Sequence, residues 1–173
     1  LVVAANAVVQ PMGLYSNKIH SLDDIKADTK IAIPNDPSNG GRALVLLEKA
    51  GNIKLKPDYK GEASIHDVAE NPRGVKLVEL EAAQLPISLQ DLDVACVPMN
   101  YAVSGGLDVN KQGFYFESRD AKYALIIIAA RPDNVQSPEV QTFVKCYQSP
   151  EVAAFIKEKF KGQINPAWEQ PAK

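Results

Sequence analysis

The sequence predicts an α/β fold with a parallel or mixed sheet, and three observations carry that prediction. Short apolar runs alternate along the chain with amphipathic segments, which is the pattern of βαβ units. The stretch from Ile31 to Gly51 reads as a short buried strand, a polar turn and a helix. Near the C-terminus, Ser137-Pro-Glu and Ser149-Pro-Glu each combine a helix cap, a proline at the first helical position and an acid in the first turn.

Apolar runs that lack helical spacing predict the strands. The first run is Leu1 to Val9, and Met12 to Tyr15 continues it past Pro11. The runs at 94–97 and 123–130 are almost wholly apolar, which indicates buried strands. A short edge strand is expected at 113–116. In chain order, the expected strands are 1–9, 12–15, 31–33, 75–80, 94–97, 113–116 and 123–130.

Helices are expected between these strands and at the end of the chain. Before the C-terminal pair, they are 21–27, 40–50, 64–70, 82–92 around Pro86, and one that starts in 100–106. The two C-terminal helices each carry an apolar stripe, which predicts a face that packs on a sheet. The stripes are Val140, Phe143, Val144 and Tyr147 in the first helix, and Val152, Phe155, Ile156 and Phe160 in the second.

The helix start near residue 40 is a candidate anion site. The first N–H groups of a helix have no partner inside it, and the helix dipole places partial positive charge there. Ser38 or Asn39 can cap this helix, and Gly40 and Gly41 would let a ligand approach the backbone. Arg42 adds a planar, permanently charged group suited to a carboxylate. The alternative is a capped turn with Arg42 as a solvated surface residue.

Composition and motifs exclude several other functions. The 173 residues carry a net charge of −2, and no two basic residues are adjacent, which argues against a nucleic-acid partner. The longest apolar run is too short to span a membrane, and the first residues lack a signal-peptide pattern. No nucleophile motif is present, and Cys96 and Cys146 are expected to be free, buried thiols. No metal site and no cofactor are expected. Gly105-Gly106 is interpreted as a helix stop.

Seven segments together resemble one known family, the NlpA-type methionine-binding lipoproteins, which are substrate-binding components of a bacterial amino-acid ABC importer. The resemblance covers nearly the whole chain in the right order. It rests most strongly on Pro-Asn-Asp-Pro-Ser-Asn at 34–39 followed by Gly-Arg, and on Glu-Ala-Ala-Gln-Leu-Pro at 81–86. The segments are Gln10–Asp24, Ile33–Gly51, Glu70-Asn-Pro, Val78–Pro86, Asn100-Tyr-Ala, Tyr147–Val152 and Pro166-Ala-Trp.

The resemblance implies a type II periplasmic-binding fold with two lobes and a ligand cleft between them. The chain would hold a near-complete second lobe and part of the first. Residues 1–20 would form part of lobe one and the hinge, 21–115 lobe two, and 116–173 the hinge return and the C-terminal helices of lobe one. In the family, an N-terminal segment with the lipid-attachment cysteine and the first βαβ units precedes residue 1. Without that segment, the strands at 1–9 and 124–130 are expected to have an open edge that favours self-association.

The resemblance also implies capture of methionine or a similar amino acid without covalent chemistry. Arg42 would pair with the ligand carboxylate, helped by N–H groups around Asn39 to Arg42, and Asn100 would hydrogen-bond the head group. Gln84 and Tyr101 would line the wall of lobe two. The expected partners are an ABC permease and its ATPase, at the periplasmic face of the membrane with a lipid anchor.

One position departs from the family pattern. Pro98 stands where methionine binders usually carry an asparagine that holds the amino-acid head group, so the ligand is expected to differ from methionine or to bind more weakly. A sensor or an enzyme domain on the same fold that binds a small carboxylate is the alternative function.

Overall fold

The computed structural model describes residues 1–118, 121 and 123–169, and the chain divides into two compact units. Unit 1 consists of Leu1–Pro11 and Ser118–Lys173, and unit 2 is the continuous segment Met12–Glu117. The chain therefore passes between the units twice, after Pro11 and after Glu117.

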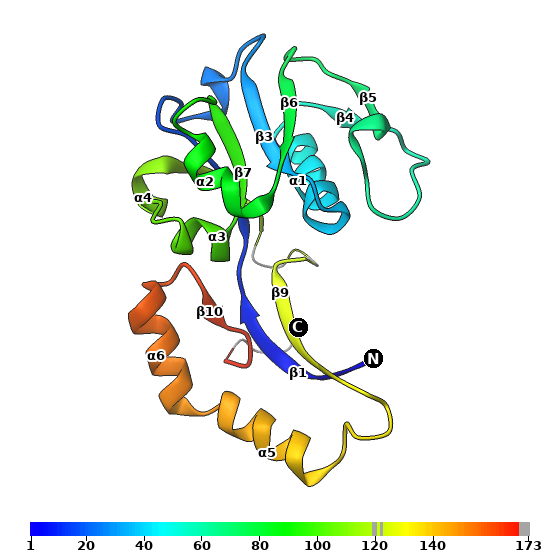
Figure 1. Cartoon of the computed structure of the whole chain (residues 1–173), viewed down its shortest axis with the longest axis vertical. Coiled ribbons are helices and arrows are strands. Elements are labelled where there is room, and N and C mark those ends of the chain that lie inside the picture. Colours follow the sequence, from blue (N-terminus) through cyan, green and yellow to red (C-terminus); the bar gives the residue numbers. More distant parts are fainter. Residues whose placement is uncertain (119–120, 122, 170–173) are drawn as a thin grey trace. The chain divides into compact units, whose positions relative to one another are not determined.

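Unit 2 is built on a five-stranded mixed sheet of the order β6-β3-β7-β2-β8 (Figure 1). The strands β6 (Lys76–Leu80), β3 (Lys30–Pro34) and β7 (Val94–Pro98) run parallel. Strand β2 (Met12–Tyr15) is antiparallel to β7, and β8 (Gly113–Phe116) is antiparallel to β2 at the edge. The sheet confirms the expected α/β class and the edge position of β8.

The centre of this sheet is the core of unit 2. Every residue of β2 and β7 is buried, and β3 is buried after its first residue. The helix α1 (Pro37–Lys49) packs against β3, and α2 (Leu85–Ser88) and α3 (Met99–Ser104) pack against β7. Ile31, Leu44 and Leu47 are each at most 1% exposed, so the apolar side of α1 is fully covered.

Several expected helices of unit 2 are shorter than their sequence suggests. The segment 21–27 forms only the 3-10 turn η1 (Leu22–Asp24), and 82–92 is reduced to the turn η3 (Ala82–Gln84) followed by α2. The predicted helix 64–70 is wrong in its second half, because the turn η2 (Ile65–Asp67) leads into strand β5 (Val68–Glu70), which pairs with β4 (Lys54–Leu55). A last short helix, α4 (Val109–Gln112), precedes β8.

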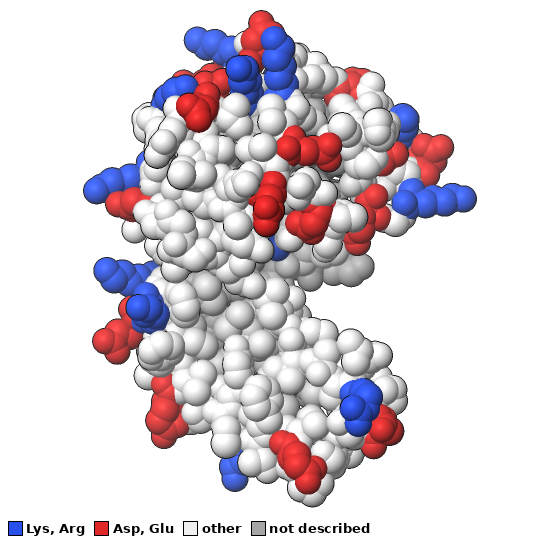
Figure 2. Space-filling view, in the orientation of Figure 1, with Lys and Arg blue, Asp and Glu red and all other residues white. Residues whose placement is uncertain are grey.

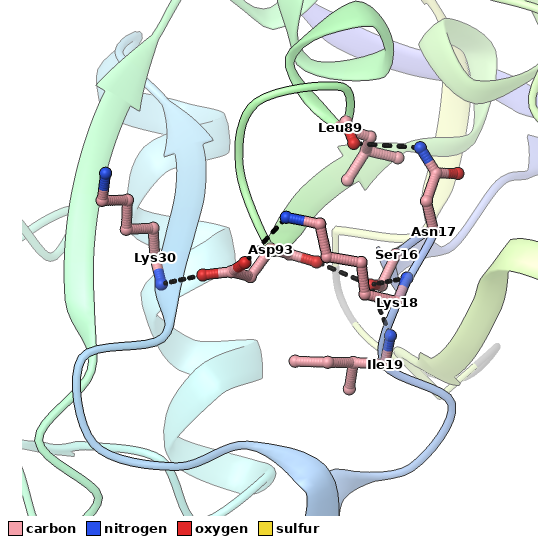
Figure 3. Close-up of polar contacts among 7 residues, drawn as sticks. All are labelled: Ser16, Asn17, Lys18, Ile19, Lys30, Leu89 and Asp93. Carbon is pink, nitrogen blue, oxygen red and sulfur yellow. Dashed lines mark hydrogen bonds and ion pairs between the residues drawn. The ribbon is translucent and has the colours of Figure 1, made fainter.

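Polar contacts connect the strands at one end of this sheet, where β3 and β7 begin and β2 ends (Figure 3). The Asp93 carboxylate accepts hydrogen bonds from the Lys30 backbone N–H at 3.0 Å and from Lys18 Nζ at 3.1 Å. The Ser16 hydroxyl donates to the Asp93 carbonyl at 2.6 Å and accepts the N–H groups of Lys18 and Ile19. The hydrogen bond from Lys30 holds the pKa of Asp93 below its usual value.

Unit 1 contains a three-stranded sheet of the order β10-β1-β9 and two helices. Strand β1 (Val2–Val9) pairs antiparallel with β9 (Leu125–Ala130) and with β10 (Asn165–Pro166). The helices α5 (Pro138–Tyr147) and α6 (Pro150–Phe160) start as expected, since the side chains of Ser137 and Ser149 each accept a helix N–H. None of the helices formed by the described residues is both long and apolar enough to cross a membrane.

Three expectations of burial in unit 1 are wrong. Strand β9 is not buried, with Leu125 and Ile127 at 37% and 41% exposure. Phe143 and Phe155, taken from the two apolar stripes, are 55% and 60% exposed, although Ile156 of the second stripe is buried. Cys146 is an exposed free thiol, whereas Cys96 is buried as expected. These apolar side chains lack enough covering partners among the described residues.

Candidate functional site

The candidate site lies at the C-terminal ends of the parallel strands of the unit 2 sheet. The Asp93 contacts lie at the other ends of these strands. Pro34 and Leu80 pair at the C-terminal ends, and Met12 pairs with Pro98 there. In open α/β sheets, ligands bind outside the carboxyl ends of the strands. All five sequence-predicted site residues come from segments that directly follow these strand ends. They are Asn39 and Arg42 after β3, Gln84 after β6, and Asn100 and Tyr101 after β7.

The start of α1 differs from its sequence prediction. Asp36, not Ser38 or Asn39, is the cap, and the helix begins at Pro37. The Asp36 side chain accepts the Asn39 N–H at 3.0 Å, and the Asp36 carbonyl accepts the Gly40 N–H at 2.8 Å. Because a capped N–H is no longer an orphan donor, these two groups are not open to an anion.

The two glycines of this helix serve packing. A Cβ atom on Gly40 would lie 2.7 Å from the Pro34 carbonyl oxygen, and one on Gly41 would lie 3.0 Å from backbone atoms of Ala63. Such distances leave no room for a side chain, so the glycines let α1 approach the strand end and the 61–65 segment. Both glycines also line a surface hollow of about 170 Å³, and their part in ligand access stays a prediction.

Arg42 is buried and ion-paired, which excludes the solvated surface role that the sequence left open. Its side chain is 7% exposed, as is the side chain of Glu117. The Glu117 Oε2 atom accepts hydrogen bonds from Arg42 Nε at 2.9 Å and Nη2 at 2.5 Å, and also from the Met12 N–H at 3.2 Å. A buried guanidinium is costly unless a carboxylate balances it. Glu117 supplies that balance at the candidate site.

The start of α3 brings Asn100 and Tyr101 to the same edge. Pro98 is the cap residue of α3 and offers no side-chain hydrogen bond, so Asn100 is not a helix cap. Asn100 is exposed in the first turn, and Tyr101 is half-buried. The buried Tyr15 hydroxyl donates to Met99 Sδ at 3.7 Å, which fixes the first residue of α3 to β2. Burial raises the pKa of Tyr15.

Gln84 is also exposed, at the end of η3. Its neighbour Pro86 packs on Gly105, the last-turn cap of α3, where an added Cβ would lie 2.5 Å from the proline Cβ. The predicted helix stop at 105–106 is confirmed, since Gly106 has a φ of +73°.

Two surface hollows in unit 2 lie beside the candidate residues and not among them. One, of about 170 Å³, is lined by the end of β3, the start of α1 and the acids Asp36, Glu62 and Glu79. The other, of about 530 Å³, lies between Asn17, Pro86, Gly105 and Gln112. Neither is lined by any of the five sequence-predicted residues. The described residues hold no group of three His, Cys, Asp or Glu side chains placed to bind a metal.

The charges on the face shown in Figure 2 are mixed. Blue and red side chains both occur among the described residues of this face, and the blue ones do not form a continuous patch there. Phosphate backbones are bound through concentrated positive charge. This face therefore does not have the character of a nucleic-acid interface.

Glu117 is the one functional candidate that the sequence did not reveal. It lies 75 positions from Arg42, at the end of an edge strand, and no local motif marks it. The only signal is the end of the strand at 113–116, which antiparallel pairing with β2 brings to the same edge as α1.

Comparisons with known proteins identify relatives over nearly the whole chain. The family model described as NlpA lipoprotein matches residues 1–168. A D-methionine-binding lipoprotein MetQ of Escherichia coli strain K12 is 42% identical over 170 residues, and a probable D-methionine-binding lipoprotein MetQ of Vibrio cholerae is 39% identical over 168. Each alignment covers 97% of this chain and 62% of the relative, so the chain spans less than two thirds of these relatives.

A solved structure shares the fold. A nutrient-binding protein from Burkholderia cenocepacia, bound to methionine, superposes with a TM-score of 0.89 at 44% identity. The superposition covers 96% of this chain and 70% of that one. Identity and coverage of this size indicate common descent in both units of the chain.

Proposed function

The chain belongs to the NlpA lipoprotein family, and from that membership we propose that it is the solute-binding component of an ABC importer that captures methionine or a related amino acid. Its α/β fold is that of solved substrate-binding proteins, and we propose that it comprises a nearly complete second lobe and part of the first. The observation that carries the proposal is the buried Arg42 guanidinium at the C-terminal ends of the parallel strands. It gains weight because the chain is a relative of methionine-binding proteins.

In this proposal, Arg42 pairs with the ligand carboxylate. A guanidinium recognises a carboxylate through two parallel N–H donors, and burial strengthens that interaction because water competes less. Asn100 is exposed in the first turn of α3 and would bond the amino-acid head group with its side-chain amide. The side chains of Asn39, Gln84 and Tyr101 complete the wall that unit 2 offers. Asn39 would do so with its side-chain amide oxygen, since its backbone N–H and its side-chain amide nitrogen both donate to Asp36.

The ligand's identity depends on the start of α3. Pro98 has neither a side-chain amide nor a backbone N–H, so it offers a head group no donor at the point where β7 ends. We therefore propose that this protein binds methionine weakly or prefers another small carboxylate-bearing molecule. Its chemistry would be binding and release without a covalent step, as for the relatives named as binding proteins.

Partners and location follow from the same proposal. Ligand binding would shift an equilibrium between open and closed arrangements of a two-lobe protein, and the closed form would deliver the ligand to a permease and its ATPase. The protein would act at the periplasmic face of the membrane with a lipid anchor, as the names of its relatives suggest.

Isothermal calorimetry on the complete gene product tests the proposal. Titration with amino acids, dipeptides and organic acids identifies the ligand, and Arg42→Ala should then weaken its binding by about 2–5 kcal/mol, the scale for truncating one partner of a buried charge pair. Arg131→Ala is the matched control, because Arg131 is an exposed arginine paired with Asp133. Unchanged affinity in Arg42→Ala would remove Arg42 from the site.

A further inference from the structure

The geometry at Glu117 gives this residue a role beyond neutralising Arg42. All three hydrogen bonds to its carboxylate end on one atom, Oε2. Two come from Arg42, through Nε and Nη2, and the third comes from the Met12 N–H. Two neighbouring donors of the guanidinium, Nε and Nη2, are therefore held at one point, which restricts the position and direction of that side of the group.

Glu117 is itself held firmly by the backbone. Its N–H donates to the Met12 carbonyl at 2.9 Å, while its side chain accepts the Met12 N–H. These two contacts extend the β2–β8 pairing by one residue beyond Phe116. Since β2 is wholly buried, Glu117 is anchored to a buried strand of the sheet, and through it so is Arg42.

We propose that Glu117 is a positioning residue for the ligand carboxylate: it holds Arg42 in the orientation that binds the ligand, and it does so without touching the ligand. This inference rests on the proposed function of Arg42. Arginine has a long side chain with many rotamers, and ordering such a side chain during binding lowers affinity. An arginine that is already fixed avoids most of that loss.

The single acceptor atom allows a sharp test. Glu117→Gln can place its amide oxygen where Oε2 lies, so that all three hydrogen bonds remain and only the charge is lost. Glu117→Leu has a similar volume but offers no acceptor. If Glu117 acts by position, Gln should preserve ligand binding and Leu should not.

The experiment is calorimetry on the complete gene product with L-methionine or, if the parent does not bind methionine, with the amino acid that the parent binds most tightly in the titrations above, which then replaces methionine in every comparison. Glu117→Leu should weaken methionine binding about tenfold, because Arg42 Nε and Nη2 lose their acceptor and the side chain must be ordered further on binding, and Glu117→Gln should stay within about threefold of the parent. The double variant Arg42→Met/Glu117→Leu, which replaces the buried pair by apolar side chains, should bind methionine as Arg42→Met does. That equality shows that Glu117 acts only through Arg42.

Each other outcome overturns a defined claim. If Gln weakens binding as much as Leu, the charge of Glu117 and not its position is responsible. If the double variant binds more weakly than Arg42→Met, Glu117 touches the ligand. If Glu117→Leu does not fold, two comparisons of affinity still test the positioning role. They are Glu117→Gln against the parent and the double variant against Arg42→Met. If Arg42→Met binds methionine as the parent does, the carboxylate site of the proposed function is refuted, and this inference with it.

Discussion

The Arg42–Glu117 pair makes a quantitative prediction for folding that needs no ligand. Both side chains are 7% exposed, so each charge has lost most of its hydration. When one partner of a buried pair is removed, the other keeps its desolvation cost, and proteins lose about 3–5 kcal/mol. When both charged side chains are replaced by apolar residues of similar size, neither has a desolvation cost and stability is often retained.

We therefore expect opposite results from a single and a double variant. Glu117→Leu should lower the free energy of unfolding by about 3 kcal/mol, because Arg42 Nε and Nη2 lose their acceptor. Arg42→Met/Glu117→Leu should lie within about 1 kcal/mol of the parent. With a urea slope near 2 kcal/mol/M, the single variant should unfold at a midpoint about 1.5 M lower.

The assay is urea unfolding followed by far-ultraviolet circular dichroism. Glu70→Leu is the control, because the Lys54–Glu70 pair is about 60% exposed on both sides and should contribute less than about 1 kcal/mol. The reasoning is refuted if the double variant is as unstable as Glu117→Leu, since the loss would then come from shape and not from a buried charge.

Three further predictions concern other contacts. Gly105→Ala should destabilise the fold by about 1–3 kcal/mol, because its Cβ would lie 2.5 Å from Pro86 Cβ; a thermal melt no lower than that of the parent would contradict this packing. The lowered pKa of Asp93 means that its contribution to stability is present above its unfolded pKa near 4 and is lost as the pH falls through its folded value. Asp93→Asn should therefore flatten the acid side of the stability curve, and an unchanged slope below about pH 4 would argue against this. Ser149→Ala should cost about 1 kcal/mol through loss of the α6 cap, measured by chemical unfolding, and an unaltered midpoint would show that the cap is redundant.

Local signals in the sequence predicted much of this fold. Serine followed by proline marked the starts of α5 and α6 correctly, because cap and first-turn preferences act within a few residues. A cap residue followed by proline, here Asp36-Pro37, also marks the start of α1. The prediction of a cap at Ser38 or Asn39 overlooked it. Apolar runs located all the strands of the five-stranded sheet.

What the sequence could not show depends on contacts far apart in the chain. Apolar side chains such as Phe143 and Ile127 were expected to be buried, but burial requires a partner surface, which composition alone does not guarantee. The pairing of Arg42 with Glu117 arises from the β2–β8 register, so no spacing rule predicts it. The assignment of Asn39, Gln84, Asn100 and Tyr101 to one ligand remains a prediction, although the topology brings their segments to one edge of the sheet.

The order of the two units along the chain determines which of them can fold first during synthesis. Unit 2 is one uninterrupted segment whose ends meet, since the Glu117 N–H donates to the Met12 carbonyl. Strand β1 instead pairs with β9, which lies more than a hundred positions later in the chain. During synthesis from the N-terminus, unit 2 can therefore close its own core before β9 is available to pair with β1. The side of the apolar, uncharged β1 that pairs with β9 is open throughout that interval, and we expect chaperones to act on it.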